Sequence, residues 1–177
     1  MALQIFEPRY LDLVSRSLKH DTGFGVTWLR AGGEVYNSDQ DTRIAQIGTY
    51  AKVVDWDSLP NKLLGITVEG EKKFRVVSSF QRDDKLHMAQ VEWLEPEPVL
   101  PLPADSNDLQ ALLARLLEHP HVERLKLAPT VNDVASLGCV LAQLLPIAEA
   151  FKFELLGIDD PLQRLDRLIA HLDEYSQ

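Results

Sequence analysis

The chain has 177 residues, 45% hydrophobic and 25% charged, a balance typical of a globular protein with one substantial core or two small ones. Its formal net charge of −9 argues against a nucleic-acid binder, which needs a basic face, and against attraction to an anionic membrane surface. No apolar run approaches the ~20 residues of a membrane span, and the first residues lack a signal-peptide pattern. We therefore expect a cytoplasmic protein.

The first predicted element is a short apolar strand that turns directly into a helix at Glu7-Pro8. Proline suits the first helical turn, because its missing N–H has no intrahelical partner there. Apolar side chains then recur at helical spacing at Tyr10, Leu11, Val14 and Leu18. We expect this strand and helix to pack against the same core.

Alternating apolar residues predict further strands over 24–29, 44–56, 64–68, 74–80 and 89–93. We expect a turn at 31–33, an exposed polar loop over 37–42, a turn at Glu69-Gly70-Glu71 and a charged hairpin tip over 82–85. Links this short require antiparallel pairing. About six such strands tend to close into a small barrel or a sandwich.

Four prolines in the segment from Glu95 to Pro103 predict an extended connector, because proline disrupts helices and cannot donate a backbone hydrogen bond to a neighbouring strand. Beyond it the apolar period becomes helical over 109–117, 134–145, 147–156 and 161–172. We expect Asp105 or Ser106 to cap the first of these helices, and Pro146 and Gly157 to end the second and third. The sequence thus predicts an α+β protein with a barrel subdomain at 1–95, a connector at 96–104 and a helical bundle at 105–177.

The side chains that could act in catalysis or bind a metal do not form a recognisable catalytic or metal-binding motif. The best match to a phosphate-binding GxxxxGK motif spans 65–72, with Glu71 in place of the lysine and strands on both sides. His119 and His121, the Asp39-x-Asp41 loop, and Ser15 with Lys19 are more simply solvated surface residues. The lone Cys139 is expected to be a small buried hydrophobe. We expect no catalytic residue, metal or cofactor.

Five blocks of sequence resemble one known family. The opening block "IFEPRYLDLV" resembles a motif of the Lon N-terminal domain family, the domain that precedes the ATPase and protease parts of Lon and also occurs alone. Four later blocks resemble stand-alone members in the same order: "GTYAKVVDWD" (48–57), "LLGITVEGEKKFRVV" (63–77), "LAQLLPI" (141–147) and "LLGIDDPLQRLDRL" (155–168). The resemblance implies a PUA-like barrel followed by a helical bundle.

Two departures from the family pattern matter. Members usually carry an extra strand of the type "PLFPL…FPG" before the opening block, and here Met1 falls almost directly on that block. Without this extra strand, the edge of the sheet with which it would pair would be left open. Where members usually have "KQxLLE", this chain reads Lys152 to Gly157 as KFELLG, so no role of the glutamine or glutamate is carried over.

The resemblance implies a non-catalytic module that binds unfolded or exposed apolar protein segments, and neither nucleic acid nor membrane. We expect its peptide-binding wall near five residues, Phe6, Arg9, Tyr10, Trp28 and Trp56. A purely structural role is the alternative: Arg9 would pair with a nearby carboxylate, and Tyr10 would pack with its hydroxyl at the rim. Two other functions remain open, a small-ligand or enzymatic protein using the barrel mouth and an RNA-binding PUA-like module.

Overall fold

The computed structural model describes residues 1–29, 44–61, 63–104, 106–123 and 129–175. The turn expected at 31–33, the loop expected over 37–42 with Asp39 and Asp41, and the possible cap Asp105 lie outside these residues.

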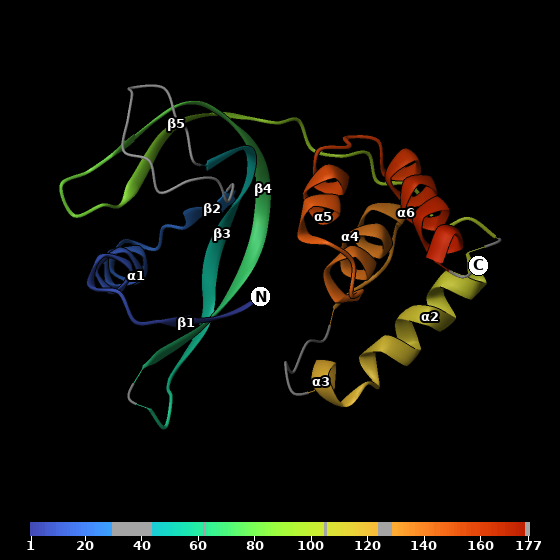
Figure 1. Ribbon diagram of the computed structural model, residues 1–177, viewed down its shortest axis with the longest axis horizontal. Helices are drawn as coiled ribbons and strands as arrows, with labels where there is room; N and C mark the ends of the chain where they lie inside the picture. Colours follow the sequence, from blue (N-terminus) through green and yellow to red (C-terminus); the bar gives the residue numbers. More distant parts are fainter. Residues whose placement is uncertain (30–43, 62, 105, 124–128, 176–177) are drawn as a thin grey trace. The chain divides into compact units, whose positions relative to one another are not determined.

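Figure 1 shows the described strands and helices in chain order. They are β1 (Ala2–Ile5), α1 (Pro8–His20), β2 (Phe24–Leu29), β3 (Ile44–Ser58), β4 (Leu64–Gln81), β5 (His87–Trp93), α2 (Asn107–Leu117), α3 (Pro120–Glu123), α4 (Val134–Leu144), α5 (Glu149–Leu156) and α6 (Pro161–Tyr175). Apart from α1, which follows β1, the strands come first and the helices after them, so the predicted α+β class is confirmed.

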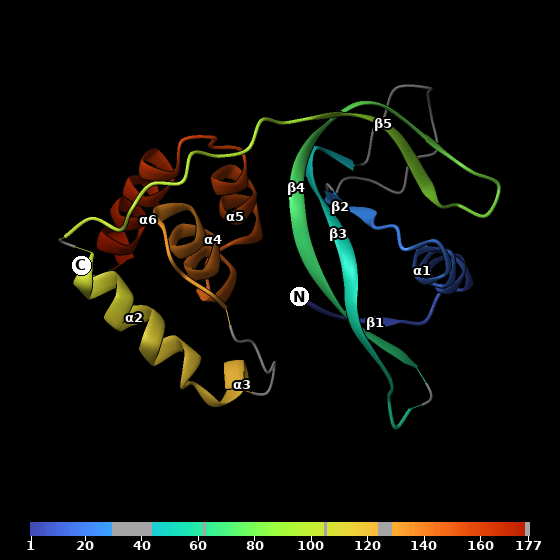
Figure 2. The same ribbon diagram turned by 180° about the vertical axis from the view of Figure 1, so that it is seen from behind.

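All five strands belong to one antiparallel sheet, organised around β4. The strand order is β1-β4-β3-β2, and β5 pairs with β4 outside this path. The first residues of β4 pair with β1, its last residues pair with β5, and β3 pairs along most of its other side. The long strands β3 and β4 curve, and α1 lies on their concave side (Figures 1 and 2).

The turn predicted at Glu69-Gly70-Glu71 is wrong, because β4 runs unbroken through it and joins two predicted strands into one. Tyr50 pairs with Lys72 while Ala51 pairs with Gly70, so Glu71 is an extra residue without a partner in β3. A Cβ on Gly70 would meet the Thr49 side chain at 2.8 Å. The glycine that suggested a turn therefore marks a β-bulge, another common place for glycine in a strand.

The side of the sheet that faces α1 holds a small apolar core. Its buried members are Val14 of α1, Ala51 of β3, and Ile66 and Val68 of β4. α1 ends at Asp21, whose positive φ of 49° places it in the left-handed region, and the Thr22 N–H donates to the Ser17 carbonyl. This packing fixes α1 against the strands. Of the predicted apolar face, Val14 is buried and Tyr10 half-buried, but Leu11 and Leu18 are exposed at 38% and 44%, because the buried side of the helix is turned toward Leu13 and Ser17.

The chain divides into two units, Met1–Pro96 and Glu97–Gln177. Residues 94–104, which include the predicted connector, contain neither helix nor strand. In the second unit α4 packs against α2, α5 and α6. Its apolar core is built from Leu113, Leu137, Leu141, Ala142, Leu145, Phe151, Leu155 and Leu168. No described helix has both the length and the apolarity needed to cross a membrane.

The ends of the C-terminal helices follow local chemistry. α4 begins at a capping box, in which the Asp133 carboxylate accepts from the Ser136 N–H at 2.7 Å and the Ser136 hydroxyl oxygen accepts from the Asp133 N–H at 3.2 Å. The predicted stop at Gly157 is confirmed, since Gly157 caps α5. Ser106 precedes α2 without a side-chain cap: its hydroxyl donates to the Pro103 carbonyl, and its oxygen accepts from the Gln110 side-chain amide at 3.0 Å.

A buried ion pair ties the start of the second unit to α6. The Arg164 side chain is only 2% exposed, and its guanidinium donates to both carboxylate oxygens of Glu97. It also donates to the carbonyls of Leu155 and Ile158. Its Nη1 lies 3.3 Å from the sulfur of Cys139. The prediction that Cys139 is buried is wrong: it is exposed, since the apolar stripe of α4 passes on the other side of the helix.

Candidate functional site

The first unit contains an apolar pocket with a volume of about 710 Å³. Its walls come mainly from β1, α1, β2 and β5, and β3 and β4 contribute two described residues each. The volume falls within the ~300–1,000 Å³ range of binding pockets in proteins.

Part of the pocket lining consists of aromatic rings that pack directly against the backbone of glycine residues. The ring of Phe74 lies over Gly25 of β2 and Gly48 of β3: an added Cβ would meet it at 3.0 Å and 2.5 Å. Trp93 packs edge-on against both Phe74 and Tyr50, with ring centroids 6.3 Å and 5.6 Å apart. Glycine at these two positions is therefore needed for the close approach of the ring to two strands.

Polar side chains among the described lining residues are few, and those of Thr27, Tyr50 and His87 have partners within the protein. The Thr27 hydroxyl lies within hydrogen-bond distance of the Ala45 and Ile47 carbonyls, and the Tyr50 hydroxyl accepts from the Gly23 N–H at 2.5 Å. Nε2 of His87 lies 3.2 Å from the Gln81 amide. Among the described lining residues there is no Asp, Glu, Lys or Arg. The pocket therefore offers apolar contact rather than charge recognition.

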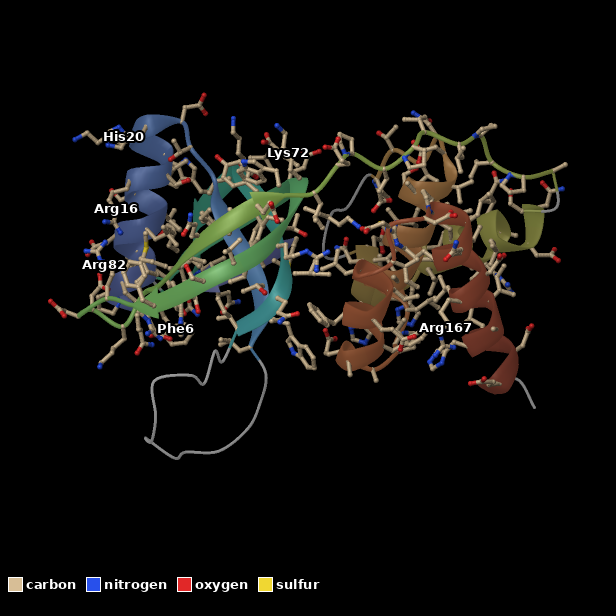
Figure 3. All side chains as sticks on the ribbon, turned by 90° about the horizontal axis from the view of Figure 1, so that it is seen from above. Phe6, Arg16, His20, Lys72, Arg82 and Arg167 are labelled. Carbon is tan, nitrogen blue, oxygen red and sulfur yellow. The ribbon has the colours of Figure 1, made fainter. Side chains whose placement is uncertain are left out.

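Phe6 and Tyr10, two of the five residues predicted for a peptide-binding wall, line the pocket. Phe6 is 67% exposed although it joins β1 to α1, so its ring is available to a partner. Figure 3 shows Phe6 beside the strands, whereas Arg16 and His20 lie on the side of α1 turned away from them.

Arg9, Trp28 and Trp56 are not part of the pocket lining. Arg9 pairs with Glu7 at 2.6 Å, as the structural alternative expected, and donates to the Lys85 carbonyl at 2.6 Å. It thereby links the start of α1 to the β4–β5 hairpin. Trp56, 61% exposed, lies on β3 opposite Ile66, and Trp28 is on β2.

Sequence reasoning did not name the β5 residues of the pocket as a site. His87, Met88, Ala89, Val91 and Trp93 all contribute to the lining. Their alternation indicated a strand, but a strand whose apolar face packs in a core has the same pattern. The signal that distinguishes them is exposure, with Met88 at 40% and Trp93 at 53%, and exposure is not visible in a sequence.

The described residues hold no cluster of three or more His, Cys, Asp or Glu side chains able to bind a metal ion. The rings of His119 and His121 stack with centroids 5.4 Å apart at the start of α3. Ser15 and Lys19 are both exposed on α1, and 65–72 lies within β4.

The chain resembles known proteins along nearly its whole length. The model of the ATP-dependent protease La (LON) substrate-binding domain matches residues 1–174. The Lon protease of Brevibacillus choshinensis is 26% identical over 151 residues, which cover 79% of this chain and 19% of that protein. This chain therefore spans about a fifth of that curated relative.

Two solved structures resemble the fold. The Lon N-terminal domain protein from Xanthomonas campestris has a TM-score of 0.72 and 31% identity, covering 96% of this chain and 88% of that one. The N-terminal domain of Mycobacterium avium complex Lon protease has a TM-score of 0.58, 18% identity and the same coverage of 96% and 88%.

Proposed function

Because the chain belongs to the family of ATP-dependent protease La (LON) substrate-binding domains, we propose that it binds unfolded or exposed apolar segments of other proteins, without catalysis of its own. The observation that carries this proposal is the apolar pocket of the first unit, with exposed Phe6 at its margin. We further propose that the protein is cytoplasmic, since its single cysteine suits a reducing compartment.

The pocket favours unfolded partners because of what it can bury. Each large aliphatic or aromatic side chain moved from water into such a pocket gains about 1.5–3 kcal/mol. A folded protein keeps most of these side chains in its own core, whereas an unfolded one presents them in extended chain. The pocket therefore distinguishes unfolded from folded proteins by whether apolar side chains are accessible, and it does not require one particular sequence.

The charge around the pocket supports a polypeptide rather than a nucleic acid as partner. Residues 1–96 carry 12 Lys and Arg against 14 Asp and Glu, so this unit lacks the excess of positive charge that phosphate backbones require. The described lining adds no positive side chain that could contact a phosphate. Both observations favour apolar side chains as the recognised groups.

A binding experiment with one client in two states tests the proposal. A fluorescently labelled protein held unfolded by reduction and alkylation of its disulfides is titrated with the chain, and fluorescence anisotropy is recorded. The same protein in native form is the control. We expect saturable binding of the unfolded form only. Equal binding of both forms, or none at high micromolar concentration, would refute the proposal.

Exposed-site variants then locate the binding surface. Phe6→Ser removes an exposed ring from the pocket margin and should weaken client binding, whereas Val99→Ser, at a residue 81% exposed in the other unit, should not. Trp56→Ser tests the wider predicted wall, because Trp56 is similarly exposed at 61% but lies outside the pocket. Unchanged binding by Phe6→Ser would exclude the pocket as the site.

The pocket volume supports a second candidate, the binding of a small apolar molecule. A fluorescent naphthalene dye that brightens on leaving water would report such binding. Displacement of the dye by the unfolded client places both at the same pocket. Dye binding without any client binding would favour the small-molecule function.

A further inference from the structure

The outer edge of β5 is available for pairing beside the pocket. β5 pairs with β4 on one side, and no strand in the described part of the chain pairs with its other side. The pocket touches the consecutive residues His87, Met88 and Ala89. Because successive side chains of a strand point to opposite faces, contact with consecutive residues indicates that the pocket reaches the strand edge and not only one face.

Two hydrogen bonds determine which backbone groups of β5 point outward. The Arg82 N–H donates to the Leu86 carbonyl at 2.9 Å, and the Leu94 N–H donates to the Lys73 carbonyl at 3.1 Å. In an antiparallel ladder, residues that bond to the partner strand alternate with residues whose N–H and C=O face away. Ala89 and Val91 therefore turn their backbone groups away from β4, and both also line the pocket.

We propose that an extended apolar polypeptide segment adds to the outer edge of β5 as a further antiparallel strand, with alternate side chains in the pocket. This inference rests on the proposed function and specifies how the client is held. The outward backbone groups of Ala89 and Val91 are the ones that the added strand bonds.

Two observations specify the chemistry of the occupant. The backbone N–H and C=O groups of a segment entering an apolar pocket lose water and require partners, which the β5 edge supplies to an extended chain. A helix satisfies its own backbone and would leave this edge unused. The described lining contains no Asp, Glu, Lys or Arg, so the inward side chains of the occupant are uncharged and apolar.

The test uses three peptides with identical side chains and different backbones. The parent is a fluorescent seven-residue peptide of alternating valine and threonine flanked by lysines; one derivative is N-methylated at its valines and the other at its threonines. With valines in the pocket, an antiparallel strand directs its valine N–H groups at β5. Each lost hydrogen bond costs up to about tenfold in affinity. We expect the valine-methylated peptide to bind at least tenfold more weakly than the threonine-methylated one.

A variant of the protein tests the same edge from the other side. Ala89→Pro removes an outward N–H but no bond to β4, because proline is tolerated on the open side of an edge strand. Ala89→Ser retains the N–H and is the matched control. Circular dichroism confirms that both variants are folded, and only Ala89→Pro should weaken binding of the parent peptide.

Three results would overturn strand addition. The first is equal binding of the two methylated peptides, and the second is no binding of the parent peptide. The third is self-association of the chain, seen by sedimentation, that the peptide does not displace, since a second copy would then occupy the edge. If the methylated peptides bind alike while the unfolded client still binds and Phe6→Ser still weakens it, strand addition fails and the proposed function stands.

Discussion

Replacing Arg164 with methionine should destabilise the helical unit strongly. The guanidinium is 2% exposed and is the donor to the Glu97 carboxylate and to the carbonyls of Leu155 and Ile158. Methionine fills much of the same volume but removes these hydrogen bonds, and Glu97, at 16% exposure, regains little water in exchange. Removing one partner of a buried pair costs about 3–5 kcal/mol in free energy of unfolding.

The stabilisation by Arg164 should not depend on pH over the neutral range. Burial disfavours the charged guanidinium, but the hydrogen bonds and negative charge of Glu97, together with the contact to the Cys139 sulfur, outweigh it, so the pKa of Arg164 is raised above its usual value. A group whose pKa is raised on folding stabilises the protein at every pH below its unfolded-state pKa and loses that contribution only above it. For arginine that loss lies beyond about pH 12, so Arg164→Met should be equally destabilising at about pH 6 and about pH 9.

Urea and thermal unfolding followed by far-ultraviolet ellipticity measure the effect. A loss of about 3 kcal/mol corresponds to a midpoint at least about 10 °C lower for a unit of this size. The matched control is Arg167→Met on the same helix, labelled in Figure 3. Arg167 is 41% exposed and pairs with Glu154 at 2.9 Å, so its loss should cost less than about 1 kcal/mol.

A double variant separates the ion pair from simple packing. Glu97→Leu together with Arg164→Met removes both charges, and it should be more stable than Arg164→Met alone, because no carboxylate remains that has lost its buried arginine. If Arg164→Met proved no more destabilising than Arg167→Met, the reasoning from burial would be refuted.

Gly48→Ala should cost about 1–3 kcal/mol in thermal unfolding, because its Cβ would meet the Phe74 ring at 2.5 Å; a stability equal to wild type would show that the ring can move aside. The same substitution at Gly138 should instead stabilise by about 0.5–1 kcal/mol, since that glycine lies within α4 and an added Cβ meets its nearest atom at 3.8 Å; a lower midpoint would contradict this. Asp133→Ala should lower the midpoint of urea unfolding by the equivalent of about 1 kcal/mol through loss of the capping box with Ser136, whereas Asp133→Asn should restore most of it.

The sequence was most informative where structure depends on neighbours in the chain. The helical spacing from Tyr10 to Leu18, the proline at the start of α1 and the stop at Gly157 all correspond to observed elements. Gly70 shows the limit of this reasoning, because a glycine between two alternating stretches predicts a turn and a bulge equally well. Only the register of β3 against β4 decides between them.

The candidate site depended on contacts that a sequence does not display. The same holds for the buried ion pair of the second unit, outside this site: Glu97 and Arg164 are 67 positions apart, so no local sequence pattern indicates their pairing. Alternation predicted which side chains of β5 share a face, but whether that face packs in a core or borders an empty pocket depends on how far α1 covers the sheet. Phe6 and Tyr10 were identified because they belong to the opening motif, whereas Met88 and Ala89 belong to none.

The central position of β4 also has a consequence for synthesis on the ribosome. Its first residues pair with Ala2–Ile5, about sixty residues earlier in the chain, while the adjacent pairing with β3 closes only a short link. Local pairings carry a small loop-closure cost and form early, and distant ones form late. In the nascent chain β1 therefore stays unpaired until β4 has left the exit tunnel. During that interval it is accessible to chaperones and proteases.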